Sequence, residues 1–137
     1  VAQMPTYYET VLKARAHIYE FYANYFSKKK WAIIPPYKDI IRSSSCHLYA
    51  LRIKDITETE RDEIISIIAS KGVAVNVHFQ PLPLLTLFKN KGYTIDKYPV
   101  AYNNYKSEIS LPIYPQLTKE QLKYIVDTVG FAVESIL

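Results

Sequence analysis

The sequence predicts an α+β fold in which a small, mainly antiparallel sheet is packed with helices. Three observations support this prediction. First, apolar residues recur at helical spacing at both ends of the chain and once between them. Second, the sequence has three segments typical of strands, and all three are short. Third, 137 residues leave room for one domain with a modest core. Because helices outnumber strands, we expect the helices to cover the sheet.

The first predicted element is a long helix over residues 6–29, a stretch without Gly or Pro. Pro35 and Pro36 then exclude a return to helix. Three short strands cannot cover the whole helix, so we expect part of its apolar stripe to face a partner chain or another domain. Spacings of three, four and seven residues define this stripe, which comprises Tyr8, Val11, Leu12, Ile18, Tyr19, Tyr22, Tyr25 and Phe26.

The sequence of the middle of the chain predicts a capped helix with one strand before it and one strand after it. Residues 47–53 (HLYALRI) are rich in bulky apolar side chains, which is typical of a strand. Thr57 and Glu60 form a capping box that begins a helix, and Gly72 ends it. β-Branched residues at alternate positions predict a second strand over residues 73–77.

Short elements follow this strand. Pro81 and Pro83 hold an extended turn, and the next residues predict short helices over 84–91 and 99–106. Residues 108–111 alternate between polar and apolar, which predicts a third strand with one buried face.

The last predicted element is an amphipathic helix. A second capping box, formed by Thr118 and Gln121, marks its beginning. One apolar face continues at helical spacing to the end of the chain, through Leu122, Ile125, Val126, Val129, Val133 and Ile136.

The composition is that of an ordinary globular chain, with 49% hydrophobic and 22% charged residues. No run approaches the roughly 20 apolar residues that a membrane span needs, and the N-terminus lacks the pattern of a signal peptide. A single cysteine, Cys46, excludes an internal disulfide and fits a reducing compartment, so we expect a cytoplasmic protein without membrane contact. Because the first residue is Val1 rather than Met, we expect a processed or excised chain.

The net charge of +4 does not by itself indicate nucleic-acid binding, because the Lys and Arg residues are scattered. The densest run, Lys28 to Lys30, lies at the predicted end of the first helix, where cations offset the helix dipole. No segment has the basic and aromatic pattern of an RNA-recognition strand. We therefore expect no nucleic acid among the partners.

Residues 72–93 and 98–121 carry the most specific motifs. The first segment is GVAVNVHFQPLPLLTLFKNKGY and the second is YPVAYNNYKSEISLPIYPQLTKEQ. They give, in order, a strand ending in His-Phe, a Pro-rich turn, a short helix, a Ser-Leu-Pro-Ile-Tyr-Pro run and the start of an amphipathic helix. In this order the chain resembles the closing segment of pyridoxal-phosphate-dependent sugar aminotransferases of the DegT/DnrJ/EryC1/StrS family. The resemblance covers essentially the whole chain.

The resemblance implies a fold like the C-terminal small domain of aspartate-aminotransferase-fold enzymes. Residues 1–137 would then be a single domain, the C-terminal one of a larger aminotransferase. The intact enzyme would move an amino group from an amino acid such as glutamate to a nucleotide-linked keto-sugar, with pyridoxal phosphate as cofactor. It would be a homodimer, and this domain would contribute substrate-pocket walls and subunit contacts.

Pyridoxal-phosphate chemistry requires a Schiff-base lysine and a phosphate cradle. No lysine of this sequence matches the family's position, and the three glycines, Gly72, Gly92 and Gly130, are isolated. The resemblance therefore implies that the N-terminal cofactor-binding domain is missing here. We expect the chain alone to contain no catalytic or cofactor-binding residue, to bind no cofactor and to be inactive.

His78 and Phe79 are the candidate substrate-binding residues. On residue type alone, a lone histidine is more often structural than functional. The resemblance implies the opposite, because His-Tyr or His-Phe at this strand end lines the substrate side of the family's active site. His78 would hydrogen-bond substrate hydroxyls or phosphates, and Phe79 would form an apolar wall. Many family members have a second histidine five residues after the first, where this chain has Pro83.

The other histidines and the cysteine indicate no further site. We interpret His47 as a structural residue at a sheet end, satisfied by nearby backbone, and His17 as solvated. Cys46 and His47 are unlike a nucleophile and its base, since neighbouring strand residues point to opposite faces. With three dispersed histidines and one cysteine, we expect no metal site.

The alternative interpretation is a stand-alone, non-catalytic module that binds a ligand or another protein. Such a module would equally lack a Schiff-base lysine and a phosphate cradle. The two interpretations differ for the longer gene product, which should bind pyridoxal phosphate only if this chain belongs to an aminotransferase.

Overall fold

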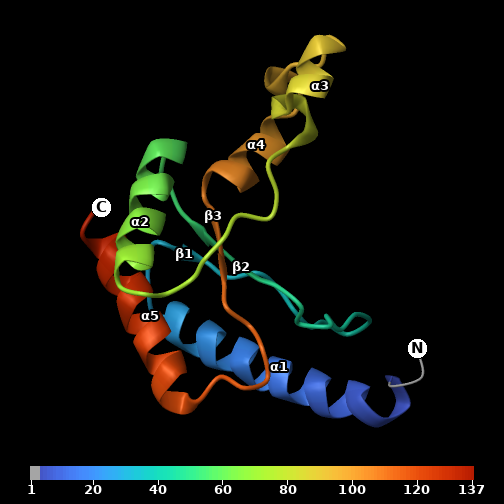
Figure 1. Cartoon of the computed structure of the whole chain (residues 1–137), viewed down its shortest axis with the longest axis vertical. Coiled ribbons are helices and arrows are strands. Elements are labelled where there is room, and N and C mark those ends of the chain that lie inside the picture. Colours follow the sequence, from blue (N-terminus) through green and yellow to red (C-terminus); the bar gives the residue numbers. More distant parts are fainter. Residues whose placement is uncertain (1–3) are drawn as a thin grey trace.

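The computed structural model describes residues 4–137, which form a three-stranded antiparallel sheet with helices packed against it (Figure 1). The central strand pairs with both neighbours, with Ala32 opposite Ile53 and Tyr49 opposite Leu111. The predicted α+β fold with a mainly antiparallel sheet is therefore confirmed. In spatial order the strands are β1 (Ala32–Ile33), β2 (Tyr49–Ile53) and β3 (Glu108–Leu111).

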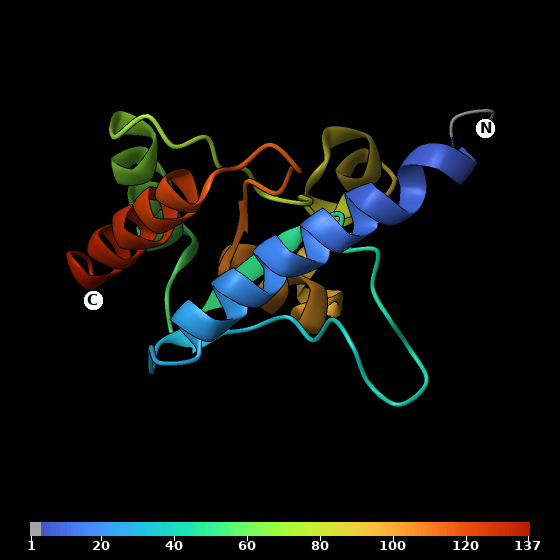
Figure 2. The ribbon, with the colours of Figure 1, turned by 90° about the horizontal axis from the view of Figure 1, so that it is seen from below.

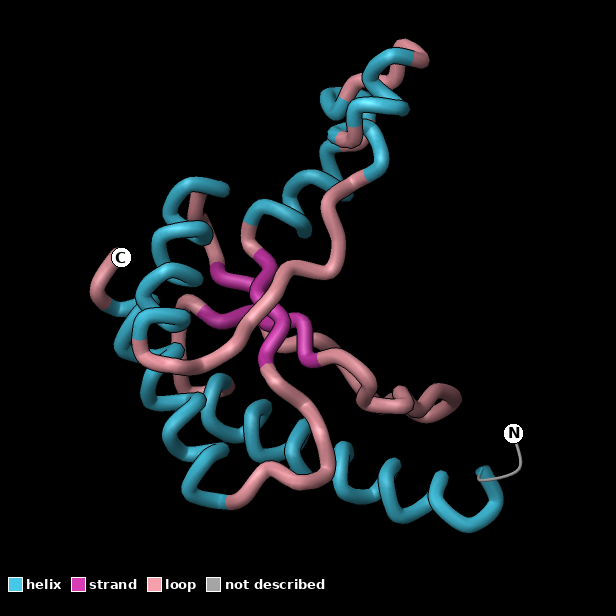
Figure 3. Tube along the Cα trace, viewed as in Figure 1, coloured by secondary structure: helices cyan, strands magenta, loops and turns pink. Residues whose placement is uncertain are grey.

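Three long helices pack around the sheet on the side of its apolar core: α1 (Met4–Phe26), α2 (Glu58–Ser70) and α5 (Lys119–Glu134). Helix α5 packs against both α1 and α2. In Figure 1, α2 and α5 lie side by side to the left of the sheet, and α1 runs below it. Figure 3 shows the strands crossing at the centre, where these helices and the remaining segments meet. None of the described helices is long and apolar enough to cross a membrane.

A projecting segment, residues 82–106, carries the short helices and is termed the arm. Figure 1 shows it leading away from the sheet at the upper right. None of its residues, all of which the structure describes, is buried, so the arm adds no side chain to the core. Its helices are η1 (Leu82–Leu84), α3 (Thr86–Asn90), η2 (Ile95–Lys97) and α4 (Pro99–Lys106).

The core lies where α1, α2 and α5 meet the sheet, and an aromatic cluster fills its centre. Tyr22 and Phe26 of α1 are fully buried with Tyr49 of β2, and the Tyr22 and Tyr49 ring centroids are 5.0 Å apart. Burying side chains of this size contributes about 1.5–3 kcal/mol each. The Tyr22 hydroxyl donates to the Pro112 carbonyl at 2.7 Å, which ties α1 to the segment that leaves β3.

Both predicted capping boxes are present. Thr57 Oγ1 accepts the N–H of Glu60 at 3.2 Å, and the Glu60 carboxylate accepts the N–H of Thr57 at 2.7 Å. Thr118 and Gln121 make the same two bonds, at 3.2 Å and 2.9 Å. Gly72 follows α2 with a φ of 77°, a left-handed conformation that favours glycine. These local signals therefore predicted correctly where α2 begins and ends and where α5 begins.

The strand predicted over residues 73–77 is wrong, since only Asn76 forms a bridge, to Ser110 of β3. The antiparallel register of this bridge places residue 74 opposite Pro112, which has no N–H to donate. At the other end, the N–H of His78 bonds to the side chain of Glu108 rather than to its backbone. The third strand is instead β1, a two-residue strand that no pattern in the sequence indicated.

The prediction that only one face of β3 is buried is also wrong. All four of its residues are buried, including Glu108 and Ser110. The segment around Asn76 and His78 contributes to this burial, because it pairs with the backbone of Ser110 along the edge of β3 and donates the His78 N–H to the Glu108 carboxylate.

The expectation that α1 is only partly covered is confirmed. Tyr7 and Tyr8 near its N-terminal end are 66% and 49% exposed, whereas Tyr19 and Tyr22 further along are buried. Figure 2 shows α1 running diagonally across the molecule, with its N-terminal end extending past the other elements. The same view shows the loop over residues 37–46 projecting away from the sheet.

Candidate functional site

A cleft between the sheet and the base of the arm contains both predicted substrate-binding residues and is termed the His78 cleft. It encloses about 360 Å³. Strands β2 and β3 and helix α4 contribute its polar side chains, because the sheet brings segments distant in sequence to one place. Its lining residues are Pro35, Pro36, Ala50, Arg52, His78, Phe79, Pro81, Ala101, Asn104, Tyr105 and Glu108.

His78 and Phe79 lie together in the turn that leads from the sheet to the arm. The peptide bond between them is cis, and their rings meet edge to face with centroids 4.7 Å apart. His78 is half-buried, and its Nδ1 is buried with no hydrogen-bond partner among the residues that the structure describes. Phe79 is 75% exposed, so its ring presents apolar surface at the edge of the cleft.

Glu108 holds the backbone of this turn. Its Oε2 accepts the N–H of His78 at 2.9 Å, and its Oε1 accepts the hydroxyl of Ser110. Burial raises the pKa of the Glu108 carboxyl, while the hydrogen bonds from Ser110 and His78 and the charges of His78 and Arg61 lower it. Both oxygens act as acceptors in these two bonds.

Arg52 of β2 places a cation in the same cleft. Its guanidinium donates to Oδ1 of Asn104 on α4, so one bond links the sheet to the arm. A guanidinium in this position has further N–H groups with which it can bind a carboxylate or phosphate.

Arg61 of α2 fixes the base of the arm. Its side chain is only 2% exposed, and its NH1 donates to the Tyr105 carbonyl at 3.1 Å and more weakly to the Glu108 carbonyl at 3.5 Å. The guanidinium carbon lies 4.9 Å from the centroid of the Tyr105 ring. The Glu58 carboxylate accepts the hydroxyls of Tyr105 and Tyr102 at 2.8 Å and 3.2 Å. Helix α2 thus sets the distance between α4 and the sheet.

The side chains of the cleft are suited to binding a ligand rather than to covalent catalysis. It combines a cation, an imidazole, an amide and exposed aromatic surface, a mixture typical of sites for polar ligands. Its lining residues, which all lie in the described chain, include no lysine and no Ser or Thr. They therefore do not fit the Schiff base and phosphate cradle that pyridoxal phosphate requires.

The sequence predicted His78 and Phe79 as candidates but not Arg52, Asn104 and Glu108, which line the same cleft. Arg52 falls within the strand predicted over residues 47–53 and Asn104 within the helix predicted over residues 99–106, and neither position by itself indicates a binding residue. A charged residue within a short strand is the one signal in the sequence that indicates Glu108, because carboxylates are almost never fully buried without partners.

The remaining sequence candidates lie outside the cleft. His17 is exposed on α1, as predicted. His47 is also exposed rather than satisfied at a sheet end, because β2 begins two residues later at Tyr49. Cys46 is buried, and burial raises the pKa of its thiol. Within residues 4–137, no group of His, Cys, Asp and Glu side chains is arranged to hold a metal ion.

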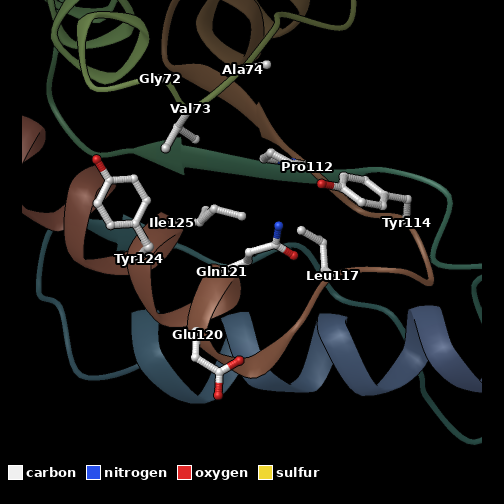
Figure 4. A pocket seen from close by; sticks show the side chains of 10 residues that line it. All are labelled: Gly72, Val73, Ala74, Pro112, Tyr114, Leu117, Glu120, Gln121, Tyr124 and Ile125. Atoms are coloured by element: carbon white, nitrogen blue, oxygen red, sulfur yellow. The ribbon is translucent and has the colours of Figure 1, made fainter.

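A second, more apolar groove lies between α5 and the segments that follow α2 and β3 (Figure 4). Tyr114 and Tyr124 stand at opposite ends of it, and the Tyr124 hydroxyl donates to the Lys71 carbonyl at 2.9 Å. The Glu120 side chain points away from the other labelled residues, whereas the Gln121 amide lies among them. It is lined by Gly72, Val73, Ala74, Pro112, Tyr114, Leu117, Glu120, Gln121, Tyr124 and Ile125.

The chain matches the model of a known protein family. The model of the DegT/DnrJ/EryC1/StrS aminotransferase family matches residues 1–130. The uncharacterized protein MJ1066 of Methanocaldococcus jannaschii is 32% identical over 123 residues, which are 88% of this chain and 32% of that protein. The UDP-4-amino-4,6-dideoxy-N-acetyl-beta-L-altrosamine transaminase of Campylobacter jejuni, serotype O:2, is 27% identical over 125 residues, 91% of this chain and 33% of that enzyme.

Solved structures show the same architecture. The PMP form of a candidate sugar aminotransferase, Spr1654 of Streptococcus pneumoniae, has a TM-score of 0.91 and 36% identity over 95% of this chain and 32% of its own. PseC of Helicobacter pylori, an aminotransferase involved in the biosynthesis of pseudoaminic acid, has a TM-score of 0.81 and 25% identity over 91% of this chain and 33% of its own. The chain therefore spans about a third of the length of the proteins it matches.

Proposed function

We propose that this chain, which belongs to the DegT/DnrJ/EryC1/StrS aminotransferase family, acts as the C-terminal domain of a sugar aminotransferase. One observation carries the proposal: the fold matches Spr1654 with a TM-score of 0.91 over 95% of this chain but only 32% of that protein. The remainder of such an enzyme would bind pyridoxal phosphate, which supplies an electron sink for the exchange of the amino group. Residues 1–137 would form one domain that contributes to substrate binding.

The role proposed for the His78 cleft is to hold a nucleotide-linked keto-sugar. The imidazole of His78, which lines the cleft, can form a hydrogen bond with a sugar hydroxyl. The exposed ring of Phe79 offers an apolar surface to the sugar. Arg52 supports the same role, since its guanidinium can bind the negative charge of a phosphate.

We further propose that the N-terminal half of α1 contacts another part of the enzyme or a second copy of it. Tyr7 and Tyr8 support this proposal because they are 66% and 49% exposed and lie on the apolar stripe or beside it. We expect the chain to self-associate in analytical ultracentrifugation at high concentration. A monomer under these conditions would count against contact between copies through α1.

The first test is the mass of the polypeptide in its native cells, measured by immunoblot with an antibody against α5. The proposal expects a band far heavier than the 15.9 kDa of this chain. A band at 15.9 kDa would instead support a stand-alone binding module without its own cofactor.

The second test examines the cleft in the longer polypeptide. With pyridoxal phosphate bound and glutamate as amino donor, His78→Ala should raise the KM for the keto-sugar by about tenfold, the equivalent of one lost hydrogen bond. Cofactor absorbance should not change, because His78 lies among residues that do not fit the cofactor. The matched control is His17→Ala, since His17 is exposed on α1, and this variant should behave as wild type. Equal KM values for the two variants would refute the role of His78.

A further inference from the structure

We infer that Glu108 is a positioning residue, which holds the backbone of the His78–Phe79 turn so that both side chains stay at the cleft. The functional part of this inference rests on the proposed role of His78 in substrate binding. The structural part concerns one hydrogen bond, between the N–H of His78 and Oε2 of Glu108, which measures 2.9 Å. This bond can be tested without any substrate.

The register of the strands shows why a side chain makes this bond. Asn76 and Ser110 exchange both backbone hydrogen bonds, Ser110 N–H to Asn76 carbonyl at 2.7 Å and Asn76 N–H to Ser110 carbonyl at 3.2 Å. If the antiparallel pairing continued, His78 would bond to the backbone of Glu108. Instead the Glu108 carboxylate takes the His78 N–H. The backbone at His78 is thereby held a side-chain length away from β3 and enters the cleft.

Several elements fix Glu108 itself. Its backbone belongs to β3, where it is paired with Arg52 of β2, and its carbonyl lies 3.5 Å from NH1 of Arg61 on α2. Its second carboxylate oxygen accepts the Ser110 hydroxyl. A carboxylate held in this way has little freedom to move, so the position it imposes on His78 is well defined.

Stability alone does not explain a carboxylate at this position. Glu108 is only 5% exposed, and a buried carboxylate costs free energy that a β-branched residue would avoid. The charged and titratable groups that face it are His78 from the turn, Arg61 from α2, Arg52 from β2 and Tyr105 from α4. The two bonds it accepts are the feature that an apolar residue would not reproduce.

Three substitutions distinguish positioning from packing. In Glu108→Gln, the amide oxygen can still accept the His78 N–H while the amide nitrogen donates to Ser110, so the turn should be retained. Glu108→Ala removes the acceptor. Glu108→Asp keeps the charge but is shorter by one methylene, so it should not reach His78.

The experiment is amide hydrogen exchange on the whole 137-residue chain, followed by NMR. Glu108→Ala and Glu108→Asp should speed exchange at His78 by about tenfold to a hundredfold relative to wild type, as expected for the loss of a bond to a charged acceptor. Glu108→Gln should stay within about threefold of wild type. Exchange at the core residues Leu51 and Ile109 should change much less than at His78. Unchanged exchange at His78, or an equal increase at all three residues, would overturn the inference.

A measurement on the wild-type chain covers the case in which Glu108→Ala does not fold. The amide proton shift of His78 should titrate together with the carboxyl carbon of Glu108, because protonation changes the acceptor of this bond. Independent titration of the two signals would overturn the inference. In the longer polypeptide, Glu108→Ala should raise the KM for the keto-sugar as His78→Ala does, with kcat little changed, and Glu108→Gln should not. If His78→Ala leaves KM unchanged, the proposed function fails while the exchange result still decides the role of Glu108.

Discussion

Replacing Tyr22 with Phe should destabilise this protein, whereas the same replacement at Tyr49 should not. The two rings are matched, since both are fully buried and their centroids are 5.0 Å apart. Their hydroxyls differ. The Tyr22 hydroxyl donates to the Pro112 carbonyl at 2.7 Å, but the Tyr49 hydroxyl has no hydrogen-bond partner among residues 4–137.

The magnitudes follow from this difference. Tyr22→Phe removes a buried hydrogen bond and leaves the Pro112 carbonyl without a donor, so the free energy of unfolding should fall by about 1–2 kcal/mol. Tyr49→Phe removes a hydroxyl that is buried without compensation, so the free energy of unfolding should be unchanged or rise by up to about 1 kcal/mol. The two variants should therefore differ by roughly 2 kcal/mol, a difference of several degrees in Tm.

Urea unfolding is the suitable assay because Trp31, the single tryptophan, provides a fluorescence signal from the same cluster. Its ring centroid lies 5.9 Å from that of Phe26, which packs on both tyrosines. Equal slopes with urea would show that the variants unfold to similar states. The reasoning is refuted if both variants lose the same stability or if Tyr49→Phe loses more.

Three further predictions concern the capping box, the centre of the sheet and pH. Thr57→Ala should lower the free energy of unfolding by about 1 kcal/mol, whereas Thr59→Ala at an exposed site on α2 should change it by less than about 0.5 kcal/mol; similar losses in urea would argue against the cap formed with Glu60. Ile109→Ala, fully buried in β3, should cost about 2–5 kcal/mol in thermal unfolding, and a loss below about 1 kcal/mol would mean that this site collapses around the smaller side chain. The pKa of the Glu108 carboxyl in the folded chain is raised above its usual 4.5, so the folded chain holds this proton more tightly than the unfolded chain. As pH rises from 4.5 through the raised pKa, the ionisation of Glu108 should therefore lower the free energy of unfolding. Glu108→Gln should remove this contribution, so plots of unfolding free energy against pH should diverge over this range; parallel plots would contradict the raised pKa.

The parts of the fold that sequence predicted correctly depend on neighbouring residues. Thr57 and Thr118 begin their helices through bonds to residues three positions later, so the pattern is complete within one turn of chain. The strand over residues 73–77 failed for the opposite reason. Whether that segment forms a ladder depends on Pro112, far away in sequence, and on the Glu108 side chain, and neither effect is visible in the segment itself.

The same distinction applies to the candidate site. His78 and Phe79 belong to one local motif, so resemblance to a family was enough to select them. Arg52, Asn104 and Glu108 come from β2, α4 and β3, and they meet only because the sheet pairs the two strands and Arg61 fixes the arm. Strand register and helix packing decide this meeting, and no spacing in the sequence expresses it.

The arm has a consequence for how the molecule responds to stress. Because none of residues 82–106 is buried, the arm can open without exposing the aromatic core, and its opening should require much less free energy than global unfolding. The cleft combines side chains from both parts, with Arg52 and Glu108 in the sheet and Asn104 and Tyr105 in the arm. Mild denaturant or moderate heat should therefore disrupt the His78 cleft while the sheet and its three long helices stay folded, so that the proposed affinity for a ligand should be lost before the overall structure.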